Sequence, residues 1–262
     1  MQGITSLEIG QVALSYIFVL LVLFIIFKRG INREKDLFIA SIRMTIQLVL
    51  AGFLLTYILN NPSPVLTISF IFAMECFAIN TVYKRFSGKL SKKLKLIIAF
   101  SMGAGTFSCI LYFLFVVIRI NPWYDPQYFI PIAGMLVGNS MTGISLGIKS
   151  LLEGMKNQKS IVEEALNLGA TPQMATKSIV DSTFDASIMP TINSMLGMGI
   201  VFLPGMMTGQ ILSGTLPTTA VAYQIIIMCG ILGAVGLTVI LMLQFGYRSF
   251  FNEEDQLIEN NF

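Results

Sequence analysis

The sequence predicts an all-α, polytopic membrane protein with about seven transmembrane helices. Of its 262 residues, 55% are hydrophobic and only 12% are charged, and the mean hydropathy is +0.76. A soluble domain is far less apolar. Several uncharged stretches also exceed the roughly 20 residues that a helix needs to cross a bilayer. We expect one transmembrane domain over residues 1–262, because the polar segments are too short to bury a core of their own.

Seven apolar stretches define the expected spans, and turns rich in polar residues separate them. They run approximately over residues 7–27, 37–59, 65–82, 96–118, 128–148, 186–212 and 218–245. Nothing basic precedes the first span, so it lacks the n-region of a cleaved signal peptide. The sixth span is interrupted by Pro204 and Gly205, which break a helix. A kink and a re-entrant turn are both open at that point, and the choice affects the number of spans.

Basic residues give the expected orientation. With the N-terminus outside and the C-terminus in the cytoplasm, 15 of the 17 Lys and Arg residues fall in cytoplasmic segments. Arg119 is then outside, and Arg43 lies within the membrane. The positive-inside rule favours this arrangement over its inverse. It also assigns the polar segment 149–185 to the cytoplasm.

Several residue types and motifs are missing from the chain. It has no histidine, which excludes imidazole-based zinc or haem sites and a Ser-His-Asp hydrolase. Its three cysteines, Cys76, Cys109 and Cys229, fall in apolar spans and argue against a disulfide framework. No Walker loop is present, so ATP-driven work needs a partner chain. We therefore expect no catalytic residue and no cofactor in this chain, and no nucleic-acid partner.

The stretch from Ser160 to Pro172 predicts two short helices that meet at a sharp corner. Ser160 and Glu163 have the spacing of a capping box. Gly169 suits a left-handed C-cap, while Thr171 and Pro172 suit the N-cap and first residue of the next helix. A corner of this kind between membrane spans is a shape that another protein can bind.

Two spans carry polar side chains that are costly in hydrocarbon. Arg43 and Gln47 are four residues apart and share one helix face, while Glu75 and Asn80 lie in the next span. Arg43 can pair with Glu75, reach the cytoplasmic headgroups or border a transport pathway, and these alternatives stay open. Glu75 lies deeper in its span, which favours a cavity or a pathway.

The fifth span combines small and polar residues. Its glycines have small-xxx-small spacing, which favours close helix packing. They are Gly134, Gly138, Gly143 and Gly147. Asn139 and Ser140 add hydrogen-bonding groups at membrane depth, suited to interhelical bonds or to a polar path.

The sixth span contributes the other candidate pathway residues, Pro204, Met206, Met207 and Gln210. Broken helices at membrane depth usually border a cavity, where freed carbonyls meet water or an ion. Methionine can ligate soft metals or fill gaps in packing. Met206 and Met207, with Glu75, are the candidate metal ligands.

The sequence Glu163-Glu164-Ala165, followed after three residues by Gly169, resembles the E-A-A-x-x-x-G motif of ABC-transporter permeases. In that family this stretch forms a coupling helix that docks into the ATP-binding subunit. Glu164 departs from the usual alanine. The resemblance implies that residues 160–172 contact a cytosolic ATPase.

Further stretches resemble the Fet-type (FetB) iron-export permeases, a family that also includes plant permeases of aluminium tolerance. They are Met135 to Thr142 with its sequence G-N-S-M, the block Leu203 to Gly214, and Ala222 to Ile225. The resemblance implies a permease in a bacterial cytoplasmic membrane that forms a homodimer. It also implies two partner ATPases that bind ATP and Mg, and a role in iron export, metal homeostasis and oxidative-stress resistance. The alternative is a secondary transporter or cation channel without an ATPase, in which Glu75 carries a proton or cation.

Overall fold

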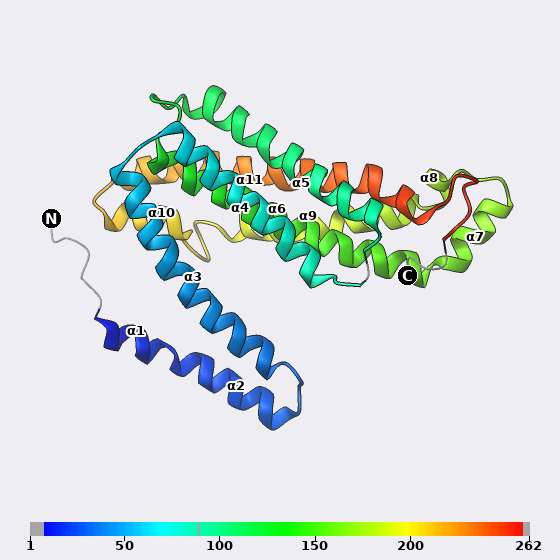
Figure 1. Cartoon of the computed structure of the whole chain (residues 1–262), viewed down its shortest axis with the longest axis horizontal. Coiled ribbons are helices and arrows are strands. Elements are labelled where there is room, and N and C mark those ends of the chain that lie inside the picture. Colours follow the sequence, from blue (N-terminus) through cyan, green and yellow to red (C-terminus); the bar gives the residue numbers. More distant parts are fainter. Residues whose placement is uncertain (1–7, 89, 259–262) are drawn as a thin grey trace.

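The structure is a computed structural model that describes residues 8–88 and 90–258. It is all-helical, as expected (Figure 1). In chain order the helices are α1 (Ile9–Ser15), α2 (Ile17–Arg29), α3 (Glu34–Asn60), α4 (Pro64–Arg85), α5 (Lys92–Tyr112), η1 (Phe113–Ile118), α6 (Pro126–Asn157), α7 (Lys159–Asn167), α8 (Pro172–Ala175), α9 (Lys177–Gly197), α10 (Gly205–Leu212), α11 (Pro217–Gly246) and η2 (Tyr247–Phe250).

Six helical segments of the described chain are long and apolar enough to cross a bilayer. They are Gly10–Arg29, Glu34–Asn60, Pro64–Arg85, Lys92–Ile118, Pro126–Asn157 and Pro217–Phe250. The sixth expected span, over residues 186–212, is not one continuous helix. The described residues therefore hold six continuous candidate spans, and two separate helices, α9 and α10, take the place of the sixth expected one.

The break in that segment is wider than the pair Pro204-Gly205. Helix α9 ends at Gly197 and α10 begins at Gly205. Between them Gly199 has a φ of 85°, a left-handed conformation that glycine adopts without strain. Its N–H donates to the carbonyl of Phe202 at 2.9 Å, which closes a turn. Pro204 lies after this turn as the N-cap of α10.

Helices α4, α5, α6, α9 and α11 pack into the central bundle. At Gly105 of α5, a Cβ atom would lie 2.5 Å from Cγ2 of Thr238 on α11, so only glycine permits this approach. The close packing expected in the fifth span is found at Gly143 and Gly147, where a Cβ would lie 2.7 Å from Val235 and 2.8 Å from Ser187. At Gly138 the space is open.

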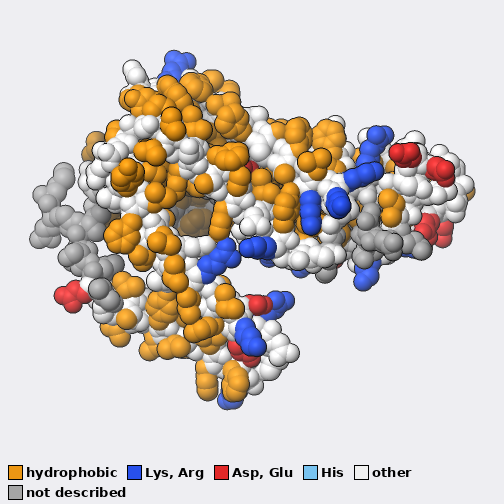
Figure 2. All heavy atoms as spheres, in the orientation of Figure 1, with side chains coloured by type: hydrophobic (Ala, Val, Ile, Leu, Met, Phe, Trp, Pro, Cys, Tyr) orange, Lys and Arg blue, Asp and Glu red, His pale blue; other side chains and the backbone are white. Residues whose placement is uncertain are grey.

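Helices α2 and α3 form a hairpin that diverges from the bundle (Figure 1). The hydroxyl groups of Tyr16 and Thr45 contact each other across it. No residue of α2 is buried, and Ile58, near the end of α3, is the one buried residue of that helix. Because the exposed side chains are mostly apolar (Figure 2), this hairpin suits lipid contact rather than water.

Successive turns alternate between two ends of the molecule (Figure 1). The α3–α4 and α10–α11 turns lie at one end. The α2–α3 and α4–α5 turns, the α7–α8 corner and the C-terminal segment lie toward the other. The long helices connect the two ends, and the polar corner extends beyond them.

Candidate functional site

The corner between α7 and α8 is built by local backbone chemistry. Gly169 has a φ of 89°. Its N–H donates to the carbonyl of Leu166 at 2.9 Å, and the N–H of Ala170 donates to that of Ala165 at 3.0 Å. This pair of bonds is a Schellman motif, which satisfies the last carbonyls of α7. Thr171 then caps α8, its Oγ1 accepting from Met174 N at 3.3 Å.

The expected capping box at the start of α7 is wrong. The helix begins at Lys159 with Gln158 as its N-cap, so Ser160 is already inside it. Glu163 lies 3.6 Å from Nζ of Lys159 (Oε1 to Nζ) as an i,i+4 ion pair. The physical reason is the length of α6, which extends to Asn157. Only Gln158 separates α6 from α7, so α7 begins at Lys159, one residue before the Ser160 that the capping-box spacing predicts as the N-cap.

One face of α7 packs against the rest of the protein, and the opposite face is exposed. Val162 is fully buried, and Leu166 packs partly against the core. Glu164 is exposed. Three apolar side chains of the corner are exposed as well: Ile161 at 60%, Leu168 at 89% and Met174 at 70%. The corner is therefore anchored but presents an unusual apolar surface.

A groove of about 980 Å³ opens beside the corner, between α8 and α9 on one side and α11 with η2 on the other. Lys177, Asp181 and Asp185 line it from α9, and Arg248 lines it from η2. The sequence pattern does not predict this groove. Its one signal was the i,i+4 spacing of the two aspartates, which places them on one helix face.

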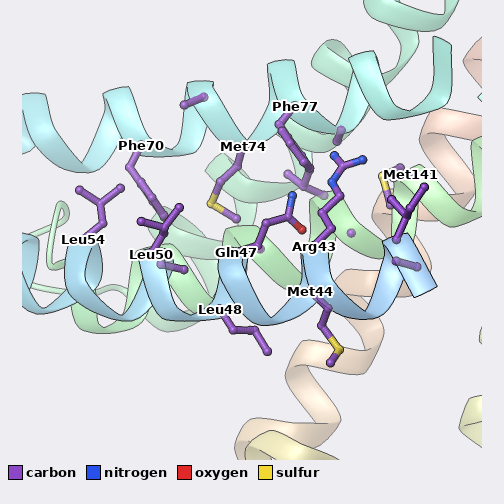
Figure 3. A pocket seen from close by; sticks show the side chains of 18 of the residues that line it. Arg43, Met44, Gln47, Leu48, Leu50, Leu54, Phe70, Met74, Phe77 and Met141 are labelled. Carbon is purple, nitrogen blue, oxygen red and sulfur yellow. The ribbon is translucent and has the colours of Figure 1, made fainter. Parts of the chain in front are cut away.

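A second groove, of about 940 Å³, lies between α3 and the pair α4 and α6. Figure 3 shows Arg43 and Gln47 directed from α3 toward α4. The guanidinium carbon of Arg43 lies 5.2 Å from the centroid of the Phe77 ring, a cation–π contact. The expected face shared by Arg43 and Gln47 thus lines a cavity wall.

Glu75 does not meet Arg43. It lies two residues before Phe77, which on a helix is a rotation of about 200°. Its Oε2 accepts from Thr106 Oγ1 of α5 at 3.1 Å, and its Oε1 is buried without a partner among the described residues. The alternative of an Arg43–Glu75 ion pair is therefore wrong. Asn80 is exposed farther along α4.

The two candidate pathway residues of α6, Asn139 and Ser140, lie in different surroundings. Asn139 is exposed, and its Nδ2 donates to the carbonyl of Met135 at 2.7 Å. Ser140 is buried, and its Oγ has no partner within residues 8–88 and 90–258. They do not form one polar path, because neighbouring positions on a helix face different directions.

The candidate metal ligands are on separate elements. Met206, Met207 and Gln210 lie on α10, which packs against α11. Met206 packs partly against the core, and Oε1 of Gln210 is buried without a partner in the described structure. Glu75 is bonded to α5. The described residues hold no group of three or more His, Cys, Asp or Glu side chains suited to a metal ion.

Comparison with known proteins gives extended matches. Residues 9–251 match the family described as "Uncharacterised protein family (UPF0014)". The chain is 37% identical to "UPF0014 membrane protein slr1647" of Synechocystis, over 88% of both chains. It is 31% identical to "Probable iron export permease protein FetB" of Escherichia coli, over 95% of this chain and 94% of the relative. It is 34% identical to "Protein ALUMINUM SENSITIVE 3" of Arabidopsis thaliana, over 94% and 88%. No solved structure matches it significantly.

Proposed function

The chain belongs to the UPF0014 family of multi-pass membrane proteins, and from that premise we propose that it is the permease subunit of an ATP-driven exporter. The cargo we propose is iron or a related metal species. A relative that covers nearly the whole chain carries the name of a probable iron export permease. In this proposal the chain contributes to metal homeostasis and to resistance against oxidative stress.

The observation that carries the proposal is the rigid, capped corner at residues 159–176. The left-handed Gly169 and the cap at Thr171 fix its backbone, and Val162 anchors it. Exposed Leu168 and Met174 offer the apolar contacts that a partner cleft can bury. A cytosolic ATP-binding subunit, which holds ATP and Mg, docks here and transmits its closure to α6 and α9.

The proposal includes an orientation and an assembly. The N-terminus lies outside, and the basic turns and the corner lie in the cytoplasm, as the positive-inside rule favours. The permease forms a homodimer and pairs with two ATPase copies. The pathway uses polar groups of the membrane region. Its buried candidates are Glu75, Ser140 and Gln210, each with an oxygen that has no partner among residues 8–88 and 90–258.

Weak binding of the cargo is consistent with this role. A transporter must release its cargo, and a few carboxylate, amide or thioether contacts suit transit better than a tight cage. Iron here is cargo that passes through, not a resident cofactor.

Transport in inverted membrane vesicles tests the proposal. With the chain, its ATPase and ATP, radiolabelled iron should accumulate inside the vesicles, and it should not do so without ATP. If another solute accumulates in place of iron, iron is not the cargo, but the chain is still a permease. No ATP-dependent flux of any solute, and no ATPase bound after purification, would reject the permease.

The unpaired Oε1 of Glu75 supports a second candidate, a secondary cation transporter or channel. Such a protein needs no ATPase. Proton-gradient-driven cation flux in liposomes that contain this chain alone would favour it over the ABC permease.

A further inference from the structure

The groove between α3 and the pair α4 and α6 is wedge-shaped and opens sideways. Helix α3 meets the bundle near Ile58, its buried residue, and diverges from it toward Glu34 (Figure 1). The groove lies along this divergence. Because both walls belong to candidate spans, an opening between them faces the bilayer, and lipid is the molecule present there at the highest concentration.

The groove is polar at one end and apolar at the other. Its polar lining residues are Asp36, Arg43 and Gln47, all within about three turns of α3. Figure 3 shows Leu50 and Leu54 continuing the same side of α3 toward Phe70 and Met74, away from Arg43. This separation matches an amphiphile with a charged head and a hydrocarbon tail.

The groove is lined by one basic residue, Arg43, and one acidic residue, Asp36. Asp36 is already paired, since its Oδ2 lies 2.8 Å from Nη1 of Arg33. Arg43 has no hydrogen bond or ion pair with the described residues, and its contact is the face of Phe77 at 5.2 Å. A ring contact on one face leaves the N–H groups at the guanidinium edge free to donate. Phosphate and carboxylate oxygens are the acceptors that fit that edge.

Exposed basic residues lie at the same end of the molecule as the wide end of the groove. Lys28, Arg29 and Lys35 belong to the α2–α3 hairpin, and Lys84 and Arg85 end α4. Figure 2 shows Lys and Arg side chains along the gap between the hairpin and the bundle, with Asp and Glu side chains beside them on the hairpin. Basic clusters next to a membrane span attract anionic lipid headgroups.

We propose that this groove binds an anionic phospholipid, with the phosphate at the edge of Arg43 beside Gln47 and one acyl chain along Leu50, Leu54, Phe70 and Met74. The lipid fills the space that α3 leaves open and holds the α2–α3 hairpin against the bundle. The site is independent of the proposed transport function, because it needs neither ATP nor a partner chain.

Native mass spectrometry of the full-length chain tests the headgroup contact. The protein is delipidated in detergent and titrated with phosphatidylglycerol or with phosphatidylcholine of the same acyl chains. We expect phosphatidylglycerol to be retained at least about tenfold better, and Arg43→Gln to remove the difference. Arg43→Lys should keep part of it, because the charge remains but the guanidinium edge is lost. Arg119→Gln, at an exposed arginine that does not line the groove, is the control and should bind as the parent does.

A second variant tests the acyl-chain wall. Gly138 lines the groove, and a Cβ there meets nothing within 4 Å, so Gly138→Leu should fill the groove without disturbing the fold. We expect it to lose phosphatidylglycerol while it keeps Arg43. Gly103→Leu, at a glycine of α5 with equally open surroundings, is the control and should retain the lipid.

Three results would overturn the proposal. Equal retention of both lipids by the parent, or full retention of phosphatidylglycerol by Arg43→Gln and Gly138→Leu, would show that the groove does not select the lipid. A lipid-free dimer that Gly138→Leu converts to monomer would assign the groove to a second copy of the chain instead. Circular dichroism of each variant shows that lost binding is not lost folding.

Discussion

The hydroxyl Oγ1 of Thr106 lies 3.1 Å from Oε2 of Glu75 and 2.6 Å from the main-chain oxygen of Met102. Its single proton can serve one of these acceptors at a time. The other carboxylate oxygen of Glu75 is buried without a partner in the part of the chain that the structure describes. A carboxyl group at membrane depth is costly to keep, so a half-satisfied one is the clearest candidate for a functional role.

Glu75→Gln separates a transport role of Glu75 from a structural one. The amide keeps the size of the side chain and can still accept from Thr106, but it cannot take up or release a proton or attract a cation. We expect ATP-dependent iron flux in inverted vesicles to fall at least about tenfold, which is about 1.4 kcal/mol of barrier. The thermal unfolding midpoint should stay the same.

Thr106→Val is the companion variant, since it removes the partner of Glu75 and keeps the shape. We expect a loss of about 1 kcal/mol of stability. Thr56→Val is its control, because Thr56 is exposed and makes only a local bond to Gly52 O at 2.8 Å. If the Glu75→Gln variant keeps the full ATP-dependent iron flux of the parent, Glu75 has a packing role and no role in transport.

Gly169→Val tests the corner. Valine at a φ of 89° is strained by about 1–2 kcal/mol or more, so the Schellman turn should open and the corner should lose its shape. We expect the partner ATPase to bind weakly and ATP hydrolysis to become independent of transport, while the spans stay folded.

Gly88→Val is the matched control for that variant. Gly88 is also left-handed, with a φ of 81°, and its Cβ position is equally open, but it lies in the α4–α5 turn. Similar backbone strain should therefore leave coupling intact. Equal loss of coupling in both variants would mean that strain, and not the corner, is responsible.

Gly105→Ala should be strongly destabilising. The new Cβ would lie 2.5 Å from Cγ2 of Thr238 and 3.0 Å from its Cα and N, and the backbone of α11 cannot move aside cheaply. Overpacking of this kind costs about 1–3 kcal/mol, which should appear as a lower midpoint in thermal unfolding. Gly103→Ala, with open space around it, should be neutral or stabilising, because alanine is the better helix former. A Gly105→Ala protein as stable as the parent would show that α5 and α11 do not pack this closely.

Local chemistry was predictable from the sequence. The left-handed Gly169, the Thr171 cap and Pro172 at the start of α8 are confirmed, because each depends on one residue and its immediate neighbours. The resemblance to the Fet-type permeases is also confirmed by matches over most of the chain, since a motif is read directly from residue identities.

Features that depend on distant contacts were less predictable. The spacing of Ser160 and Glu163 predicts a helix cap, but the length of α6 decides where α7 begins. Arg43 and Glu75 lie in neighbouring spans, which permits an ion pair between them. In the structure, however, Glu75 faces α5 and Phe77 faces Arg43, and this depends on how α4 is rotated about its axis. The sequence does not predict the close approach at Gly105, because the residue that it contacts, Thr238, lies far along the chain.

Met206→Leu and Met207→Leu decide whether thioether sulfur contributes to metal transit. Met206 packs partly against the core, and leucine nearly conserves the volume of methionine, so each variant should cost less than about 1.5 kcal/mol. We expect iron flux in inverted vesicles to stay within about twofold of the parent, because flexible packing explains these residues and Glu75 lies on another element. Met195→Leu, at a partly exposed methionine of α9, is the control. A selective loss of iron flux in Met207→Leu, with an unchanged unfolding midpoint, would instead make its sulfur a ligand on the path.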